Sequence, residues 1–302
     1  MKQSTNIMSF QEFCERFSSE EACREKLFKM RWPNGFVCPK CGGVEHGYHR
    51  AKKVYQCKAK YCRHQASVTA GTVMEHTRLP IKVWFWAIYL LSTDKRGSSA
   101  TYLSNVLKIR YKSAWLLLQK LRSSMGNRDA RYLLDGIVEF DDTYFGGPKS
   151  GGKRGRGTSK TKVLVALSKD KEGKPRYLKM MVVPNLKGKT IGAFAKSAIA
   201  ENAIVETDAY RSYRRPLSEN WSHTSQIYDP NGQSLAWLHT IVSNAKSFVQ
   251  GTFHGLDSIH LDRYLDEFCW RFNRRWHTRD IFSDLLRAVV SAPSATYAEL
   301  KG

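Results

Sequence analysis

Two cysteine pairs place the strongest constraint on how this chain folds. Cys38-Pro-Lys-Cys41 is followed, after fifteen residues, by Cys57-Lys-Ala-Lys-Tyr-Cys62. Paired cysteines at such short spacing supply thiolates from tight turns, and four of them complete the tetrahedral set that zinc prefers. Because no position would remain open for a substrate, we expect a structural zinc, with His49 or His64 able to replace one cysteine. Ordinary buried cysteines are the alternative, and this spacing counts against it.

The charge balance indicates the partner. The 302 residues include 49 Lys and Arg against 27 Asp and Glu, a formal net charge of +22, which predicts a polyanion such as nucleic acid or an anionic membrane. The longest apolar run, Val83–Leu91, is nine residues, whereas a membrane-spanning helix needs about 20. The N-terminus shows no signal peptide, and seven cysteines, four at metal spacing, fit a reducing compartment. We therefore expect a cytoplasmic, nucleoid-associated protein that binds double-stranded DNA and no membrane.

Sequence patterns divide the chain into four regions. Residues 1–36 predict short amphipathic helices that stop at a Pro and an Asn-Gly, and residues 37–76 form the expected zinc ribbon. Residues 77–130 become helical. Residues 131–302 alternate strands and helices, beginning with three successive strands, which predicts an α/β domain with a mixed sheet.

Within residues 77–130, two helices resemble a helix-turn-helix. The first begins at Ser98-Ser99, a short basic turn follows, and the second helix begins near Ser113. The cations at the turn, which suit contact with DNA in the major groove, are Lys108, Arg110 and Lys112. A helical hairpin that packs the zinc module is the alternative, and the net charge favours DNA contact.

Acidic residues are scarce, so two on predicted strands stand out. Asp141 lies on the first strand of the α/β region, in Glu139-Phe-Asp-Asp142, and Asp208 closes the strand over residues 203–207. Carboxylates placed in this way bind Mg²⁺, and two can share a pair of ions for phosphoryl transfer. Turn or capping roles would explain either aspartate alone. Their occurrence together in a basic domain favours a metal site.

The third metal ligand is open, because the helix expected after about residue 234 begins without an acidic residue. Asn244 offers an amide oxygen, which binds Mg²⁺ weakly. His239 and Lys246 are seven residues apart and share one helical face, so either could lie beside the metals or contact a phosphate. A hydrogen-bonded core histidine next to Trp237 is the alternative for His239.

A glycine-rich basic loop over residues 146–160 follows the first strand. It contains no acidic residue, and its cations include Lys153, Arg154 and Arg156. A solvated tether is the alternative, but the position beside Asp141 favours a clamp on the DNA backbone.

Six motifs together resemble one known family. They are RWPNGFVCPKCG, YQCKAKYCRHQASVTAGTVM, VEFDDTYFGG, VETDAYRSY, HTIVSNAKSFVQGTFHG and HLDRYLDEFCWRFNRR. In this order, over roughly residues 20–290, they are similar to bacterial insertion-sequence transposases that carry a zinc ribbon before a DDE-type, ISXO2-like domain. The resemblance implies an RNase H-like fold.

The resemblance also implies a function and a set of roles. Such an enzyme binds the terminal inverted repeats of its element and catalyses Mg²⁺-dependent DNA cleavage and strand transfer, as a dimer or larger homo-oligomer. The catalytic positions fall on Asp141 and Asp208, which would hold two Mg²⁺ or Mn²⁺ ions, and on Asn244 after His239, where many relatives have Glu. The alternatives are a domesticated, catalytically silent DNA-binding regulator and a metal-dependent nuclease without strand transfer.

Overall fold

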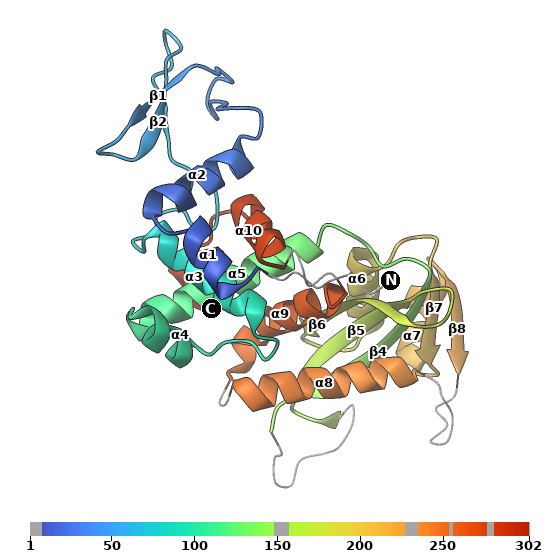
Figure 1. Ribbon diagram of the computed structural model, residues 1–302. Coiled ribbons are helices and arrows are strands. Elements are labelled where there is room, and N and C mark those ends of the chain that lie inside the picture. The colour runs from blue at the N-terminus through green and yellow to red at the C-terminus, as the bar shows by residue number, and fades with distance from the viewer. Residues whose placement is uncertain (1–7, 148–156, 227–234, 254–255, 277–280, 302) are drawn as a thin grey trace. The chain divides into compact units, whose positions relative to one another are not determined.

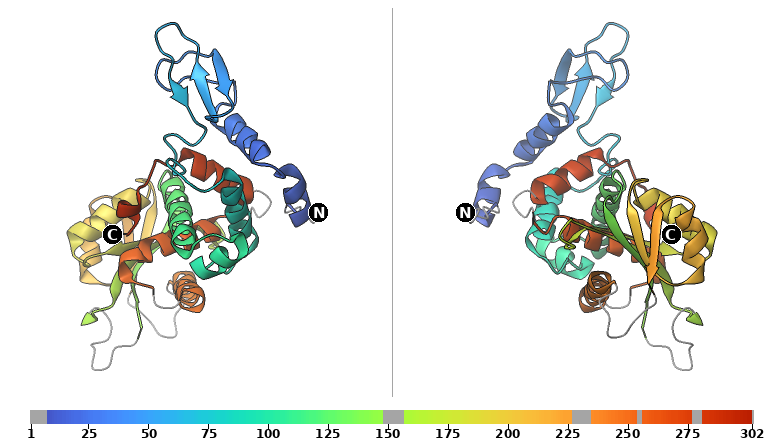
Figure 2. Two further views of the ribbon diagram at one scale, coloured as in Figure 1. Left: turned by 90° about the vertical axis from the view of Figure 1, so that its left-hand side faces the viewer. Right: turned by 90° about the vertical axis from the view of Figure 1, so that its right-hand side faces the viewer.

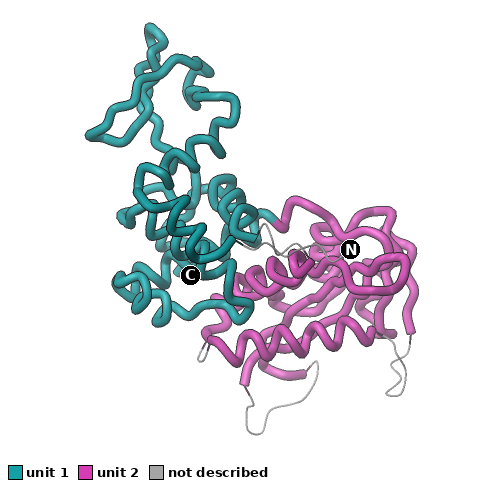
Figure 3. The backbone as a smooth tube through the Cα atoms, in the orientation of Figure 1, with its two compact units in different colours: residues 1–128, 277–301 teal, residues 129–276, 302 magenta. Residues whose placement is uncertain are grey.

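The computed structural model describes residues 8–147, 157–226, 235–253, 256–276 and 281–301. The chain divides into two compact units (Figure 3). Unit 1 comprises residues 1–128 and 277–301, and unit 2 comprises residues 129–276 with residue 302. Among the described helices, none is long and apolar enough to cross a membrane.

Unit 1 combines a small sheet with helices. Its elements are α1 (Phe10–Arg16), α2 (Glu20–Arg31), β1 (His46–His49), β2 (Val54–Cys57), β3 (Gln65–Ala66), α3 (Ile81–Thr93), α4 (Ala100–Leu107), α5 (Tyr111–Asp129), α10 (Ile281–Ser291) and α11 (Tyr297–Lys301). Serine side chains accept hydrogen bonds from the first-turn amides of α1, α2 and α4, as expected for N-caps. The strands form an antiparallel sheet in the order β1-β2-β3, the predicted zinc ribbon.

The end of the chain differs from the expected division, which assigned all of residues 131–302 to the catalytic domain. Residues 277–301 belong to unit 1. The Phe282 ring of α10 lies within 5.4 to 6.1 Å, centroid to centroid, of the rings of Phe13, Phe17 and Phe85. The apolar face of α10 is thus buried among helices from the start of the chain, and no local pattern in the sequence specifies that partner.

Unit 2 is built on one five-stranded sheet (Figure 1). Its elements are β4 (Ile137–Phe145), β5 (Thr161–Lys169), β6 (Pro175–Val183), α6 (Gly188–Ala198), β7 (Ile204–Asp208), α7 (Arg211–Ser218), β8 (Ser222–Gln226), α8 (Ala236–Thr252), the 3₁₀ turn η2 (Ser258–His260) and α9 (Leu261–Asn273). The strand order is β6-β5-β4-β7-β8. The first three strands are antiparallel, and β4, β7 and β8 are parallel. This is the RNase H-like arrangement, so the predicted fold is confirmed.

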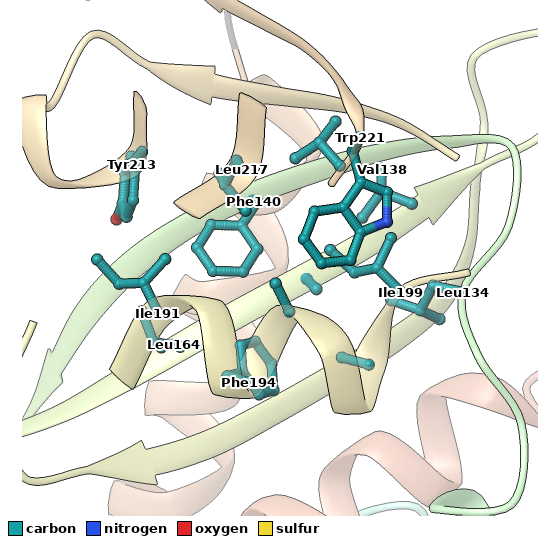
Figure 4. Packing of buried hydrophobic residues seen from close by; sticks show 14 of the residues in the cluster. Leu134, Val138, Phe140, Leu164, Ile191, Phe194, Ile199, Tyr213, Leu217 and Trp221 are labelled. Atoms are coloured by element: carbon teal, nitrogen blue, oxygen red, sulfur yellow. The ribbon is translucent and has the colours of Figure 1, made fainter. Parts of the chain in front are cut away.

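Both faces of the sheet are covered (Figures 2 and 4). On one face, Val138 and Phe140 of β4 pack with Ile191 and Phe194 of α6 and with Tyr213 of α7. On the other face, alternate residues of β5 and β6 pack against α8 and α9. Side chains alternate along β4, so even-numbered residues such as Phe140 point to α6 and α7, and odd-numbered residues point to α8.

Candidate active site and metal centre

The four cysteines of the ribbon converge as predicted. All four Sγ atoms lie within 4.8 Å of one another. The Sγ atoms of Cys38 and Cys62 are 3.7 Å apart, and those of Cys41 and Cys57 are 3.6 Å apart. A tetrahedral zinc with bonds of about 2.3 Å requires sulfur atoms about 3.8 Å apart, so the donor set fits zinc. His49 and His64 are not part of this group.

The two candidate catalytic aspartates lie on neighbouring parallel strands. The register of β4 and β7 pairs Glu139 with Glu206 and Phe140 with Thr207. The next residue on each strand is Asp141 and Asp208. Facing residues of parallel strands share one side of the sheet, and neighbouring strands are about 4.8 Å apart. Both aspartates therefore lie side by side at the carboxyl end of β7, on the α8 face.

Asp142 has a different environment from Asp141. Its side chain points to the α7 face, where the Tyr213 hydroxyl donates a hydrogen bond of 2.6 Å to its Oδ1 atom. The same hydroxyl is 3.5 Å from an oxygen of Asp141. Tyr213 is fully buried, and burial, followed by the charges of Asp141 and Asp142, raises the pKa of its phenol. Tyr213 therefore remains a hydrogen-bond donor to the pair of aspartates.

Glu139 joins the sheet to the start of α8. Its side chain is 4% exposed. One oxygen accepts the backbone N–H of Leu238 at 3.1 Å, and the other is 3.1 Å from Nζ of Lys169. Lys169 also bonds Glu206 at 2.7 Å. Although burial opposes it, hydrogen bonds to Glu206 and Glu139 raise the pKa of Lys169. Since residue 235 provides no side-chain cap for α8, Glu139 supplies one from β4.

The flanks of α8 separate the two candidate third ligands. A helix turns by about 100° per residue, so residues four apart share a flank. Asn244 is on the flank of Phe248, whose ring centroid lies 5.6 Å from that of Phe268 in α9. His239 and Lys246 are on the other flank, directed away from α9 and, by the strand order, toward β7. Both candidates are exposed. His239 thus lies on the flank of α8 away from α9, and Asn244 lies on the flank toward α9.

The sheet edge does not contain a closed three-ligand set. The four cysteines are the one described group of three or more His, Cys, Asp or Glu residues whose donor atoms lie within 4.8 Å of one another. For His239 to join Asp141 and Asp208 in one ligand set, its imidazole would have to approach the two carboxylates.

Of the basic residues predicted to contact DNA near the aspartates, the structure describes one and not the other three. Lys246 of α8 lies with its Nζ 6.0 Å from the ring centroid of Phe145 in β4. Burial, followed by the charge of Lys160, lowers the pKa of Lys246. The loop residues Lys153, Arg154 and Arg156 lie outside the described residues.

The helix-turn-helix candidate has an exposed turn and a buried second helix. Lys108, Arg110 and Lys112 are all exposed at the junction of α4 and α5. Beyond its first turn, however, α5 is mostly buried in unit 1, at positions that include Leu117, Leu118, Gln119, Leu121, Arg122 and Ser124. Only the beginning of α5 can therefore enter a groove of DNA. Several of these buried positions carry polar residues, so the hydrophobic periodicity of the sequence did not indicate that α5 is buried.

Comparisons with known proteins agree with these features. An ISXO2-like transposase domain model matches residues 133–273, and a transposase zinc-ribbon domain model matches residues 18–65. An uncharacterized transposase-like protein of Haemophilus influenzae is 30% identical over 97 residues, which are 31% of this chain and 78% of that protein. An uncharacterized protein in the transposable element ISH50 of Halobacterium salinarum is 28% identical over 230 residues, 70% of this chain and 74% of that protein. The chain belongs to the family of transposases that join a zinc ribbon to an ISXO2-like domain.

Solved structures give weaker likenesses. The Mos1 mariner paired-end complex with Mn aligns at a TM-score of 0.26 and 13% identity, covering 68% of this chain and 78% of that chain. A pre-cleavage Mos1 transpososome aligns at a TM-score of 0.25 and 13% identity, covering 70% and 79%. Scores of this size do not establish a shared fold, which the strand order supports independently.

Proposed function

We propose that this member of the transposase family is an active DNA transposase, which cuts the ends of its element and joins them to target DNA in the cytoplasm. The observation that carries the proposal is the register of β4 and β7, because Asp141 and Asp208 are the residues that directly follow its last pair, Phe140 and Thr207. A pair of adjacent carboxylates in a chain with a net charge of +22 is suited to phosphodiester chemistry.

The donor chemistry at this edge fits a hard divalent cation. Asp141 and Asp208 offer carboxylate oxygens, which Mg²⁺ and Mn²⁺ prefer, and they would hold two such ions. When bound, the ions supply Lewis acidity that activates a water or a 3′-hydroxyl and stabilises the leaving oxygen. Tyr213 would help to orient Asp141, because its hydroxyl donates to Asp142 at 2.6 Å and lies 3.5 Å from an oxygen of Asp141. Lys246, on the flank of α8 that faces the pair, would neutralise a DNA phosphate.

We assign the third ligand position to His239 rather than to Asn244. The assignment is supported by the flanks of α8, because Asn244 shares its flank with Phe248, which packs against α9. Glu139 fixes the N–H of Leu238, the residue that precedes His239, to the same face of the sheet as Asp141. An imidazole nitrogen is a softer donor than a carboxylate oxygen, so this site would accept Mn²⁺ at least as well as Mg²⁺.

Unit 1 is proposed to recognise the terminal inverted repeats. Its zinc ribbon and the exposed cations Lys108, Arg110 and Lys112 would contact double-stranded DNA. Joining two ends requires at least a dimer on DNA. A catalytically silent regulator would use the same surfaces, whereas a simple nuclease would cut without joining.

An in vitro strand-transfer assay with cognate end DNA and Mg²⁺ or Mn²⁺ tests the proposal. Asp141→Asn and Asp208→Asn each remove a ligand charge while preserving side-chain shape, so cleavage and joining should both fall by at least about 10³-fold. Binding to end DNA should persist. Asp135→Asn is the control. Asp135 precedes β4 and its side chain is exposed, so this substitution should leave both steps unchanged. Joining by the Asp141→Asn protein would exclude this active site, and wild-type binding without chemistry would favour the silent regulator.

A further inference from the structure

Four cations gather where α6 and α7 begin. Lys187 and Lys189 flank Gly188 at the start of α6, and Arg211 and Arg214 lie in the first turn of α7. All four side chains are exposed. Neither first turn contains an acidic residue. We refer to these four residues as the α6–α7 basic surface.

The two helices approach closely at this surface. A Cβ atom added at Gly188 would lie 3.8 Å from the Pro216 side chain and 3.9 Å from the Ser212 carbonyl oxygen. A Cβ atom at Gly192, one turn further along α6, would lie 3.3 Å from Cβ of Pro216. The glycines therefore permit a backbone approach that brings the cations of the two helices together. Figure 4 shows Ile191 of α6 and Tyr213 of α7 next to each other beside Phe140.

The α6–α7 basic surface lies at the carboxylate edge of the sheet. Because β4 and β7 are parallel and β6 runs in the same direction as β4, the helices that follow β6 and β7 both begin at this edge. Arg211 is three residues after Asp208. Tyr213, in the same turn of α7, reaches Asp142 with its hydroxyl. The surface thus begins three residues after Asp208 in the chain, on the face of the sheet opposite to α8 and Lys246.

The four cations have no acidic partner among the described residues of unit 2. None of them forms an ion pair within the described part of the chain, whereas the neighbouring Arg215 pairs with Glu219 at 2.8 Å. Four unpaired cations in close proximity repel one another, and this repulsion is relieved by a polyanion. Four such cations at the edge that carries Asp141 and Asp208 are suited to the backbone phosphates of a DNA strand.

We propose that the α6–α7 basic surface binds backbone phosphates of the DNA that enters the Asp141–Asp208 site. This inference rests on the proposed function. The DNA would be contacted from both faces of the sheet, by Lys246 on the α8 side and by the α6–α7 basic surface on the other. The phosphates belong either to the element end or to the target, and the two sources are separable by experiment.

The test uses the full chain with all four cations replaced, Lys187→Gln, Lys189→Gln, Arg211→Gln and Arg214→Gln. The control removes the same charge at the opposite end of the sheet and of α6, by Lys171→Gln, Lys174→Gln, Arg176→Gln and Lys196→Gln. A second variant exchanges Lys and Arg at the four surface positions and keeps the charge. Fluorescence anisotropy with an end duplex, at a series of salt concentrations, gives the slope of log affinity against log salt.

The slope is negative, and each phosphate contact contributes about 0.9 to its magnitude. Losing two to four contacts should therefore make the slope shallower by about 2 to 4. The opposite-end control and the charge-conserving variant should keep the wild-type slope. An unchanged slope, accompanied by at least a tenfold loss of joining by precut ends, would assign the surface to target DNA. Slope and joining both equal to those of the opposite-end control would overturn the inference. Failure of the wild-type protein to cut or join would instead overturn the proposed function. A shallower slope for the four-cation variant would in that case still support DNA binding by the surface.

Discussion

At the scale of single residues, the alternation of a strand separates two adjacent aspartates that look equivalent in the sequence. Asp141 points to the α8 face with Asp208, and Asp142 points to the α7 face, where Tyr213 bonds it. The prediction chose Asp141 from its place on a strand in a basic domain, and the family resemblance implied the same residue. Period-two alternation provides a physical basis for preferring it to Asp142. The role of Tyr213 could not be predicted, because nothing local indicates that a tyrosine on the next helix reaches back to β4.

Tyr213→Phe is expected to lower cleavage about 5- to 50-fold. The substitution removes only the hydroxyl, so the packing of the ring against Phe140, at a centroid distance of 5.4 Å, is retained. Without the hydroxyl contacts to Asp142 and Asp141, the Asp141 carboxylate is less well oriented, and more Mg²⁺ should be needed for the half-maximal rate. The measurement is a titration of rate against metal concentration. Tyr177→Phe, in the same core but on β6, serves as the control. An unchanged metal requirement would assign Tyr213 a purely structural role.

His239→Ala and Asn244→Ala discriminate between the two candidate ligands. We expect His239→Ala to lose at least about 100-fold in cleavage, as for the loss of one electrostatic contact, and Asn244→Ala to stay within about threefold. His239→Glu should restore activity and shift the preference toward Mg²⁺, because it replaces nitrogen by oxygen. Initial rates in Mg²⁺ and Mn²⁺ provide the comparison. The reverse ranking of the two alanine variants would return the ligand position to Asn244.

At the scale of elements, the first three strands of unit 2, α6, β7 and α8 could be predicted, because most of them have a clear hydrophobic period, whereas α7 was not predicted between β7 and β8. Two packing arrangements could not be predicted either. The burial of α5 depends on polar residues such as Gln119 and Ser124 lying inside unit 1, and α10 depends on partners more than 190 residues away in the chain. Periodicity shows that a helix has a face to bury, but it does not specify the surface that covers it.

Glu139→Gln is expected to weaken the attachment of α8 to the sheet. The variant keeps an acceptor for the Leu238 N–H but loses the charge that faces Lys169. Because this group is almost fully buried, we expect the free energy of unfolding to fall by about 1–3 kcal/mol. Cleavage should fall further than binding, since α8 carries His239. Urea unfolding and cleavage rates measure the two effects. Glu172→Gln, at an exposed pair with Lys174, is the control and should change neither.

At the scale of the whole molecule, zinc should stabilise one unit and not the other. We expect one zinc per chain by elemental analysis, and a chelator should lower the unfolding temperature of unit 1 while that of unit 2 is retained. Although burial acts in the opposite direction, hydrogen bonds from the amides of Lys40 and Cys41 lower the pKa of Cys38 to about 7, which favours the thiolate that binds metal. Cys38→Ser should lose the zinc, whereas Cys14→Ser should keep it. Full zinc content in Cys38→Ser would exclude the site.

The division of unit 1 between both ends of the chain affects the order in which the protein matures during synthesis. Unit 2 is encoded by one continuous segment and can fold as soon as residue 276 has left the ribosome. Unit 1 is complete only after α10 has been synthesised, because the Phe282 ring of α10 packs against the rings of Phe13, Phe17 and Phe85. A chain that stops short after residue 276, through a nonsense mutation or an abandoned translation, would therefore contain the whole 129–276 segment of unit 2 but an incomplete unit 1. Completeness of the reading frame is in this way a condition for the packing of unit 1.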